Sequence, residues 1–178
     1  NSEIKFDLKN ENKINLITDS SNFNLICLPA DNFPNFANDF NSEEFTFNKS
    51  KILSLMNKSK ISISSDDTRH YLNGIFLHTT ETDNKDYLTA VATDSHRLSS
   101  SSIEIEKGKK FNSIILPKKT VFQICNLLQE TEEKVIIQTS DNKIQFKLGK
   151  TKLISKVIDG KFPDYKKVVP TENSKSLS

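Results

Sequence analysis

The chain has 178 residues with a formal net charge of +2, and 35% of its residues are hydrophobic. This length suits one domain plus part of another, or two small domains, and so balanced a charge argues against a protein that binds nucleic acid by bulk charge. No apolar run reaches the roughly 18 residues needed to cross a bilayer, and no secretion-signal pattern opens the chain. Because it does not start with Met, we expect it to begin within a longer protein.

Residues 1–30 alternate apolar and polar side chains in the manner of β-strands. The apolar positions predict three antiparallel strands around residues 4–8, 14–16 and 23–25, with polar hairpin turns at 9–12 and 19–22. Three strands alone bury little surface, so we expect them to complete a sheet whose other strands lie elsewhere. Residues 31–42 are rich in Asn, Asp and Phe and predict a linker.

The next segment predicts a strand, a helix and three further strands. The strand covers residues 43–47, and Asn48 is a plausible N-cap for a helix that ends near Lys58. The core stripe of this helix consists of Ile52, Leu55, Met56 and Ser59. Strands are expected at 71–79, 87–93 and 97–105, with residues 80–86 as a polar turn.

Leu116-Pro117 predicts the start of a second helix, with the proline at or near the first helical position. Its buried stripe is Val121, Ile124, Cys125 and Leu128. Strands follow at 134–138, 143–147 and 151–158, before a tail rich in proline and polar residues. The fold expected is α+β, with helices on one face of antiparallel sheets.

A short internal repeat connects the two ends of the chain. Residues 12–16 resemble residues 142–146, and residues 31–36 resemble residues 159–165. Repeated sequence indicates repeated structural units. We therefore expect two similar domains that each end in antiparallel strands, the first represented by its tail and the second complete over about 43–162.

Cys27 and Cys125 each lie among apolar residues and predict two buried free thiols in a reducing compartment, hence a cytoplasmic protein. The glycines are isolated and form no phosphate-binding loop, and the carboxylates show no metal-ligand spacing. We expect neither a metal nor a cofactor. The lone imidazoles of His70 and His78 are interpreted as surface groups.

Residues 93–97 contain a Ser, a His and an Asp, which raises the hypothesis of a hydrolase that uses Ser95, His96 and Asp94. Neighbouring side chains on a strand point to opposite faces, so a strand–turn–strand corner with Asp94 and Ser95 in the turn is favoured. A hydrolase and a generic β-rich adaptor remain the alternatives from this pattern.

Two basic spots could contact nucleic acid, and a solvated surface is the competing interpretation of each. Arg69, His70 and Tyr71 combine charge with rings that can stack on bases. Lys118 and Lys119 lie in the first turn of a predicted helix, where backbone N–H groups favour a phosphate.

Four stretches, at residues 71–74, 90–98, 116–119 and 159–170, occur in the order and spacing of the bacterial DNA polymerase III beta subunit family, the sliding clamps. The resemblance covers nearly the whole chain. It implies that residues 1–40 are the end of the first clamp domain and a linker, 41–163 the middle domain, and 164–178 a linker and the start of the third domain. It further implies a non-enzymatic, homodimeric ring whose helices line a channel for duplex DNA.

The resemblance also implies a pocket for short peptides of the DNA polymerase III alpha subunit, the clamp loader and repair proteins. The pocket positions it assigns are Leu72, Thr93, Ser95, His96, Arg97, Leu98, Pro163, Lys167 and Val168. Ser95 stands where the family usually has Gly, and Lys167 where Arg is common. The positions it turns toward DNA are Arg69, His70, Tyr71, Lys118 and Lys119, and the family often has Tyr in place of His70.

Overall fold

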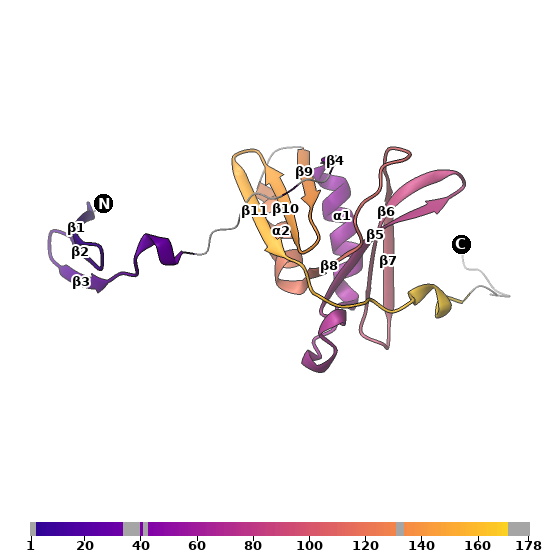
Figure 1. Cartoon of the computed structure of the whole chain (residues 1–178), viewed down its shortest axis with the longest axis horizontal. Coiled ribbons are helices and arrows are strands. Elements are labelled where there is room, and N and C mark those ends of the chain that lie inside the picture. The colour runs from indigo at the N-terminus through magenta and orange to yellow at the C-terminus, as the bar shows by residue number, and fades with distance from the viewer. Residues whose placement is uncertain (1–2, 34–39, 41–42, 131–133, 171–178) are drawn as a thin grey trace. The chain divides into compact units, whose positions relative to one another are not determined.

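The computed structural model describes residues 3–33, 40, 43–130 and 134–170, and the chain divides into two compact units, residues 1–38 and 39–178 (Figure 1). The first unit is an antiparallel meander of β1 (Lys5–Asn10), β2 (Lys13–Ile17) and β3 (Asn22–Ile26), which confirms the three expected strands. A 3₁₀ turn, Ala30–Asn32, follows it. Most of the linker expected over 31–42 lies outside the described residues.

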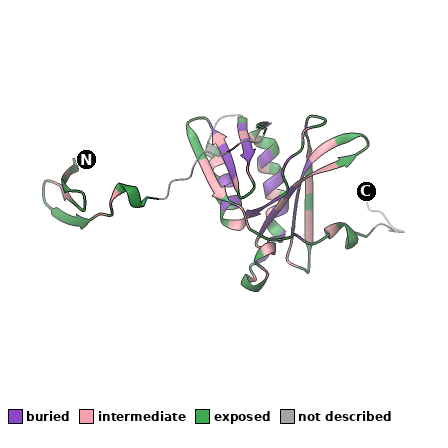
Figure 2. Cartoon of the chain, viewed as in Figure 1, coloured by how far each residue is buried: buried purple, intermediate pink, exposed green. Residues whose placement is uncertain are grey.

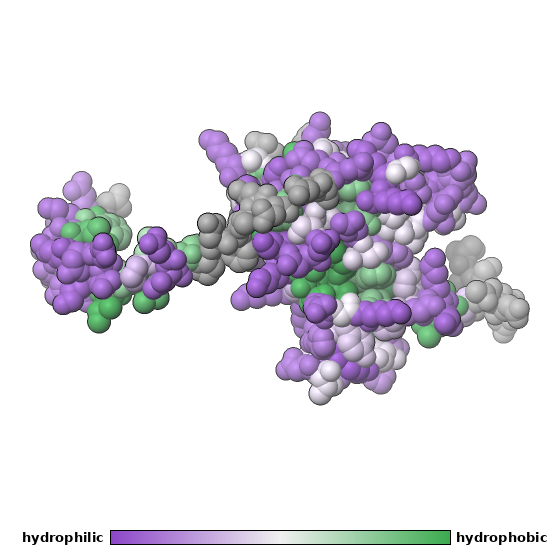
Figure 3. All heavy atoms as spheres, in the orientation of Figure 1, coloured by the Kyte–Doolittle hydropathy of each residue, from purple (hydrophilic) through white to green (hydrophobic). Residues whose placement is uncertain are grey.

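The apolar side chains of the two outer strands of the meander are open to solvent. Phe6 is 67% and Leu8 68% exposed, and apolar atoms lie on the surface of this unit (Figures 2 and 3). Cys27 is only half-buried, so the expectation of a buried thiol there is wrong. The physical reason is that a single three-stranded layer has nothing packed over it within the described part of this unit.

In its described residues, the second unit has two four-stranded antiparallel sheets and two α-helices, which confirms the α+β class. One sheet has the order β7-β6-β5-β8, with β5 (Gly74–Thr82), β6 (Lys85–Thr93), β7 (Leu98–Glu104) and β8 (Ile114–Pro117). The other has the order β11-β10-β9-β4, with β4 (Phe45–Asn48), β9 (Lys134–Thr139), β10 (Lys143–Leu148) and β11 (Thr151–Lys156). The helices are α1 (Lys49–Ser59) and α2 (Lys118–Glu130).

The two halves of this unit exchange strands. β4–α1–β5–β6–β7 and β8–α2–β9–β10–β11 repeat one order of elements, yet β4 pairs with β9 and β8 pairs with β5. In each pair, the last residue before a helix faces the first residue of the partner strand: Asn48 faces Lys134, and Pro117 faces Gly74. The second unit therefore consists of two similar helix-and-sheet halves.

Both helices bury the stripes that the sequence predicts. α1 packs against β4, β6, β7 and α2, and α2 packs against β5 and β8. All eight stripe residues are at most 3% exposed, and seven of them join the strand residues of both sheets in one core; Ser59, the polar one, bonds to the backbone oxygens of Leu55 and Ala90. Asn48 occupies the N-cap position of α1 without a side-chain capping bond, so its side chain adds nothing to the helix start.

Some expected boundaries in this unit differ from the structure. β5 begins at Gly74, because a 3₁₀ segment, Asp67–Leu72, takes up the apolar residues expected to start it. The polar turn expected over 80–86 shrinks to Asp83-Asn84, whose φ values of 51° and 60° suit a two-residue hairpin. Pro117 ends β8, on an edge strand where no N–H is required, and directly precedes Lys118, the first residue of α2, so the proline lies near the helix start as expected.

The internal repeat corresponds to the same strand register in both units. Lys13 faces Ile26 in the β2–β3 pair, and Lys143 faces Lys156 in the β10–β11 pair, an offset of 130 on both strands. The hairpins close alike, since the N–H groups of Cys27 and Val157 donate to the carbonyls of Asn12 and Asn142. Repetition at this level supports two copies of one structural unit.

None of the helices in the described ranges is long and apolar enough to cross a membrane.

Candidate functional site

A groove of about 430 Å³ lies where the end of β6 and the start of β7 meet the segment after β11. Three elements bring its lining together: the 3₁₀ segment before β5, the β6–β7 turn and the chain after Phe162. Its lining residues are Leu72, Thr93, Ser95, His96, Arg97, Leu98, Pro163, Asp164, Tyr165 and Val168.

The floor of the groove belongs to a second apolar cluster, separate from the main core. Leu72, Val91, Ile115 and Phe162 are its buried members, and Leu98 packs against them. Leu72 is 2% exposed, so the backbone around it is fixed by packing. A preformed apolar floor can accept an apolar anchor without first having to order itself.

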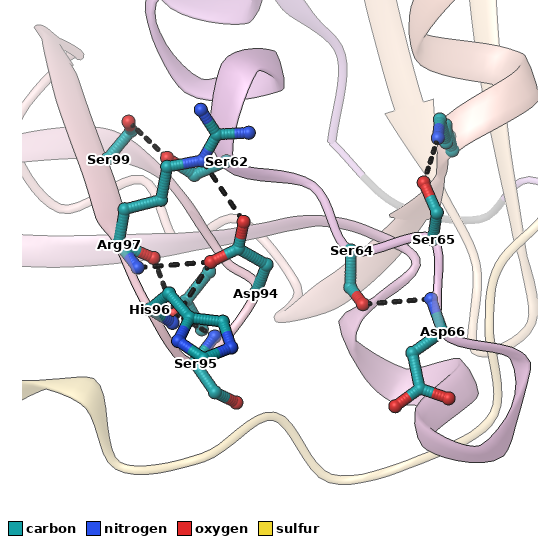
Figure 4. A network of polar contacts seen from close by, with 11 residues as sticks. Ser62, Ser64, Ser65, Asp66, Asp94, Ser95, His96, Arg97 and Ser99 are labelled. Atoms are coloured by element: carbon teal, nitrogen blue, oxygen red, sulfur yellow. Dashed lines mark hydrogen bonds and ion pairs between the residues drawn. The ribbon is translucent and has the colours of Figure 1, made fainter.

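The β6–β7 turn forms one lip of the groove and is rich in internal hydrogen bonds (Figure 4). Asp94 Oδ1 accepts the backbone N–H groups of His96 and Arg97, both at 3.0 Å, and Oδ2 accepts Arg97 Nε at 3.0 Å. The backbone N–H of Arg97 and then that of His96 lower the pKa of Asp94, so the carboxylate is ionised near neutral pH. The turn thus presents the exposed side chains of His96 and Arg97 on a fixed frame.

Aromatic stacking fixes the opposite wall of the groove. The Phe162 ring stacks on Phe76 with centroids 5.0 Å apart, and Phe76 stacks on His78 at 4.5 Å. His78 Nε2 lies 3.1 Å from the hydroxyl of Tyr165, which lines the groove. His78 is therefore half-buried and not a surface group as expected, and burial lowers its pKa.

Eight of the nine pocket positions suggested by the sequence lie together along this groove. Lys167 is the exception: its Nζ lies 3.4 Å from Asp164 Oδ2 and its side chain is 80% exposed, outside the lining. Sequence reasoning missed Asp164 and Tyr165. The sequence signal for Tyr165 was its position close to Phe162. Two aromatic side chains so near each other in sequence can both pack on a sheet and fix the segment that carries them.

The two basic spots differ in their surroundings. Arg69 Nε donates to Asp66 Oδ2 at 2.9 Å and Nη1 donates to Ser95 Oγ at 2.6 Å. Lys118 Nζ donates to Ser65 Oγ at 2.7 Å, whereas Lys119 is exposed. The structure brings Arg69 to the lip of the groove and keeps both lysines in the first turn of α2. Their role toward DNA stays a prediction.

The residues of the hydrolase hypothesis do not form a catalytic array. Ser95 Oγ accepts from Arg69, and the Asp94 carboxylate is taken up by its own turn. Within the described ranges, no hydrogen bond joins the His96 ring to either side chain, so a base beside the nucleophile is lacking. Over the same ranges, no group of three or more His, Cys, Asp or Glu side chains could hold a metal ion.

Comparisons with known proteins agree on one family. The family model for the DNA polymerase III beta subunit, central domain, matches residues 46–164. The chain is 38% identical over 159 residues to the beta sliding clamp of Caulobacter vibrioides and 36% identical over 158 residues to that of Escherichia coli K12. These alignments cover 89% and 88% of this chain but 43% and 42% of the relatives, so the chain spans less than half their length.

Solved structures give the same result for the fold. The sliding clamp of Bartonella birtlesii bound to griselimycin superposes with a TM-score of 0.85 at 35% identity, covering 97% of this chain and 46% of that one. The sliding clamp of Caulobacter crescentus superposes with a TM-score of 0.86 at 34% identity, covering 98% and 47%.

Proposed function

The chain belongs to the DNA polymerase III beta subunit family, the beta sliding clamps, and on this premise we propose that the full-length protein is the processivity factor of a replicative DNA polymerase. It is a non-catalytic, homodimeric ring that encircles duplex DNA in the cytoplasm without sequence preference. Residues 1–40 end its first domain, 41–163 form its middle domain, and 164–178 lead into its third. A net charge of +2 is compatible with this, because a topological link needs no tight phosphate binding.

The open meander supports this domain assignment. The equivalent meander β9–β11 is flanked by β4, and the side chains of Ile144 and Phe146 on its middle strand are fully buried. In the first unit the corresponding Ile14 and Leu16 are only half-buried. This difference in burial is expected if residues 1–40 are the end of a domain whose other strands and helices, which would cover Ile14 and Leu16, lie outside this range.

The observation that carries the partner-binding proposal is the groove, with its buried apolar floor and fixed polar lip. A peptide from the polymerase alpha subunit, the clamp loader or a repair protein would place Leu or Phe anchors on Leu72 and Leu98. The exposed Arg97 and His96 would bind its polar atoms at the rim. Such a site requires no cofactor.

Fluorescence anisotropy with a labelled peptide that carries Leu and Phe anchors tests the groove in the full-length protein. Leu98→Ala and Arg97→Ala should each weaken binding, by about ten-fold and about five-fold for a partly buried anchor contact and an exposed rim contact. Ile61→Ala and Lys85→Ala are matched controls, because both residues are exposed and lie outside the groove. Unchanged binding by both groove variants contradicts the site.

The ring is tested separately. Light scattering of the full-length protein should give the mass of a dimer, and the protein should be retained on circular but not on linear duplex after loading. A monomer at micromolar concentration would contradict the ring without bearing on the groove.

A further inference from the structure

A direct hydrogen bond connects the groove to the spot expected to face DNA. Arg69 Nη1 donates to Ser95 Oγ at 2.6 Å, although the two residues are 26 positions apart. Ser95 lines the groove, and Arg69 is not among its lining residues. The guanidinium therefore lies behind the lip and reaches it through one side chain.

Asp66 fixes the orientation of Arg69. Its Oδ2 accepts Arg69 Nε at 2.9 Å, and its Oδ1 accepts both the hydroxyl and the backbone N–H of Thr68. The Thr68 hydroxyl, the Thr68 N–H and the Arg69 guanidinium lower the pKa of Asp66 to about 2. The carboxylate stays ionised at every physiological pH, so the planar guanidinium is aimed at Ser95 by a permanent partner.

Ser95 is the position where the lip is least stable by itself. Its φ of 76° lies in the left-handed region, which disfavours any residue with a Cβ. Its N–H donates to Thr93 Oγ1 at 3.1 Å, and the bond from Arg69 is the contact that its side chain makes within the described residues. Removing that bond would leave a strained residue without a side-chain anchor at the lip that carries His96 and Arg97.

Arg69 retains donors for a second ligand. A guanidinium has five N–H donors, and two are used by Asp66 and Ser95 in the part of the chain that the structure describes. The Arg69 side chain is 38% exposed, so a phosphate oxygen can reach it. A phosphate held in a fork by Nη1 and Nη2 competes with the neutral Ser95 hydroxyl for Nη1, because its anionic oxygens are the stronger acceptors.

We infer that Arg69 is a positioning residue for the groove and that its bond to Ser95 couples peptide binding to phosphate binding at Arg69. The inference rests on the proposed function, since it takes a peptide in the groove and a DNA phosphate at the 3₁₀ segment. A phosphate on Arg69 releases the lip, and a released lip must be ordered again when a peptide binds. The two ligands therefore weaken each other, each by the same factor.

A double-mutant cycle on the full-length protein tests the bond. Arg69→Gln removes the charged donor, and Ser95→Ala removes the acceptor while keeping the Cβ and its strain. With the labelled Leu/Phe peptide, each single variant should bind about five-fold more weakly, the usual effect of one partly exposed bond to a charged donor. The double variant should lose no more than either single variant. Losses that multiply, or no loss at all, overturn the inference.

A second measurement tests the coupling itself. Peptide affinity is measured at constant salt with and without a saturating short duplex DNA, in the wild type and in Ser95→Ala. The duplex should weaken the peptide about three- to five-fold in the wild type and leave its affinity in Ser95→Ala unchanged, because that variant has no bond left to break. An equal effect of the duplex on both proteins would instead indicate competition for the groove and overturn the coupling.

The failure of the inference is distinguishable from failure of the proposed function. If the wild type binds the peptide and Leu98→Ala weakens it, but the cycle is additive, the groove stands and only the role of Arg69 falls. If the wild type does not bind the peptide, the proposed groove is wrong and the inference falls with it. Rescue by Arg69→Lys should be incomplete, because an ammonium cannot hold Asp66 and Ser95 through a planar fork.

Discussion

Replacing Gly74 by Ala should destabilise the second unit strongly, because no space exists for a side chain where β5 meets β8. A Cβ at this position would lie 2.2 Å from the carbonyl oxygen of Leu116, 3.0 Å from its carbonyl carbon and 3.1 Å from Ile115 Cγ2. Two of these atoms are backbone, so no rotamer change relieves the contact. β8 would have to move by about 1 Å to reach an ordinary contact distance.

That displacement determines the size of the effect. Overpacking costs about 1–3 kcal/mol, and each lengthened ladder hydrogen bond adds about 1 kcal/mol. We expect a loss of about 3 kcal/mol in the free energy of unfolding, or about 10 °C in Tm for a unit of about 140 residues. Leu72 and Ile115, each close in sequence to one side of this contact, belong to the apolar cluster that includes the groove floor, so peptide affinity should fall as well.

Gly108→Ala is the matched control. Its φ of 84° disfavours a Cβ, but nothing lies within 4 Å of where the Cβ would be, so it isolates the conformational cost of about 1 kcal/mol. Thermal unfolding followed by circular dichroism, with urea unfolding for the free energies, measures both variants. If Gly74→Ala loses no more stability than Gly108→Ala, the close approach of β5 and β8 is not what requires glycine.

Two further predictions concern titration and salt. Burial lowers the pKa of His78, so the unfolded chain holds more protons than the folded one between the two pKa values, and the free energy of unfolding should fall as pH drops below about 6.5. Urea unfolding at pH 7.5 and 5.5 should show this, and His78→Phe, which keeps a ring on Phe76, should reduce the dependence; an undiminished slope would exclude His78 as its source. The second prediction concerns a plot of the log of the affinity for short duplex DNA against the log of the salt concentration. Lys119→Ala should reduce the steepness of this plot by about one, whereas Lys85→Ala, at an exposed site in the β5–β6 hairpin, should leave it unchanged. Equal slopes for the two variants would contradict a channel-facing Lys119.

The helices could be predicted because their burial follows their sequence period. The stripes from Ile52 and from Val121 are spaced at helical intervals and are fully or almost fully buried, so the helical period itself indicates which face of each helix packs on the core. The β10–β11 register could be anticipated as well. Asn12 and Asn142 occupy the same position in the two copies of the repeat, and the carbonyl of each accepts the hydrogen bond that closes its hairpin.

The boundaries could not be predicted where tertiary contacts override local preference. Tyr71 and Leu72 have the composition of a strand, but the close pairing of Gly74 with β8 starts the strand later. β8 has four residues and gains its stability from a partner 40 positions earlier, which no local pattern reveals. Thr80 to Thr82 are polar because they lie in the outer part of a hairpin, so they resemble a turn.

The groove shows the same limit at the level of single side chains. Leu72, Thr93 and Pro163, which the resemblance assigns to one pocket, line the same groove, because the order of elements fixes which backbone segments meet. It placed Lys167 there too, but the bond of this residue to Asp164 and its exposure are decided by the local 3₁₀ turn Tyr165–Lys167. Side-chain direction in an irregular segment depends on a few dihedral angles that sequence spacing does not determine.

At Ser95, a departure from the usual family sequence has a direct structural consequence. The usual Gly of the family fits a φ of 76°, which a residue with a Cβ adopts at a cost of about 1 kcal/mol. In this chain the hydroxyl that comes with the Cβ accepts a bond from Arg69 that a glycine could not accept. A charge-assisted bond at a partly exposed site contributes a similar amount. The substitution is therefore close to neutral for folding, and its consequence falls on the lip of the groove, where the side chain of Ser95 is bonded to a neighbouring arginine.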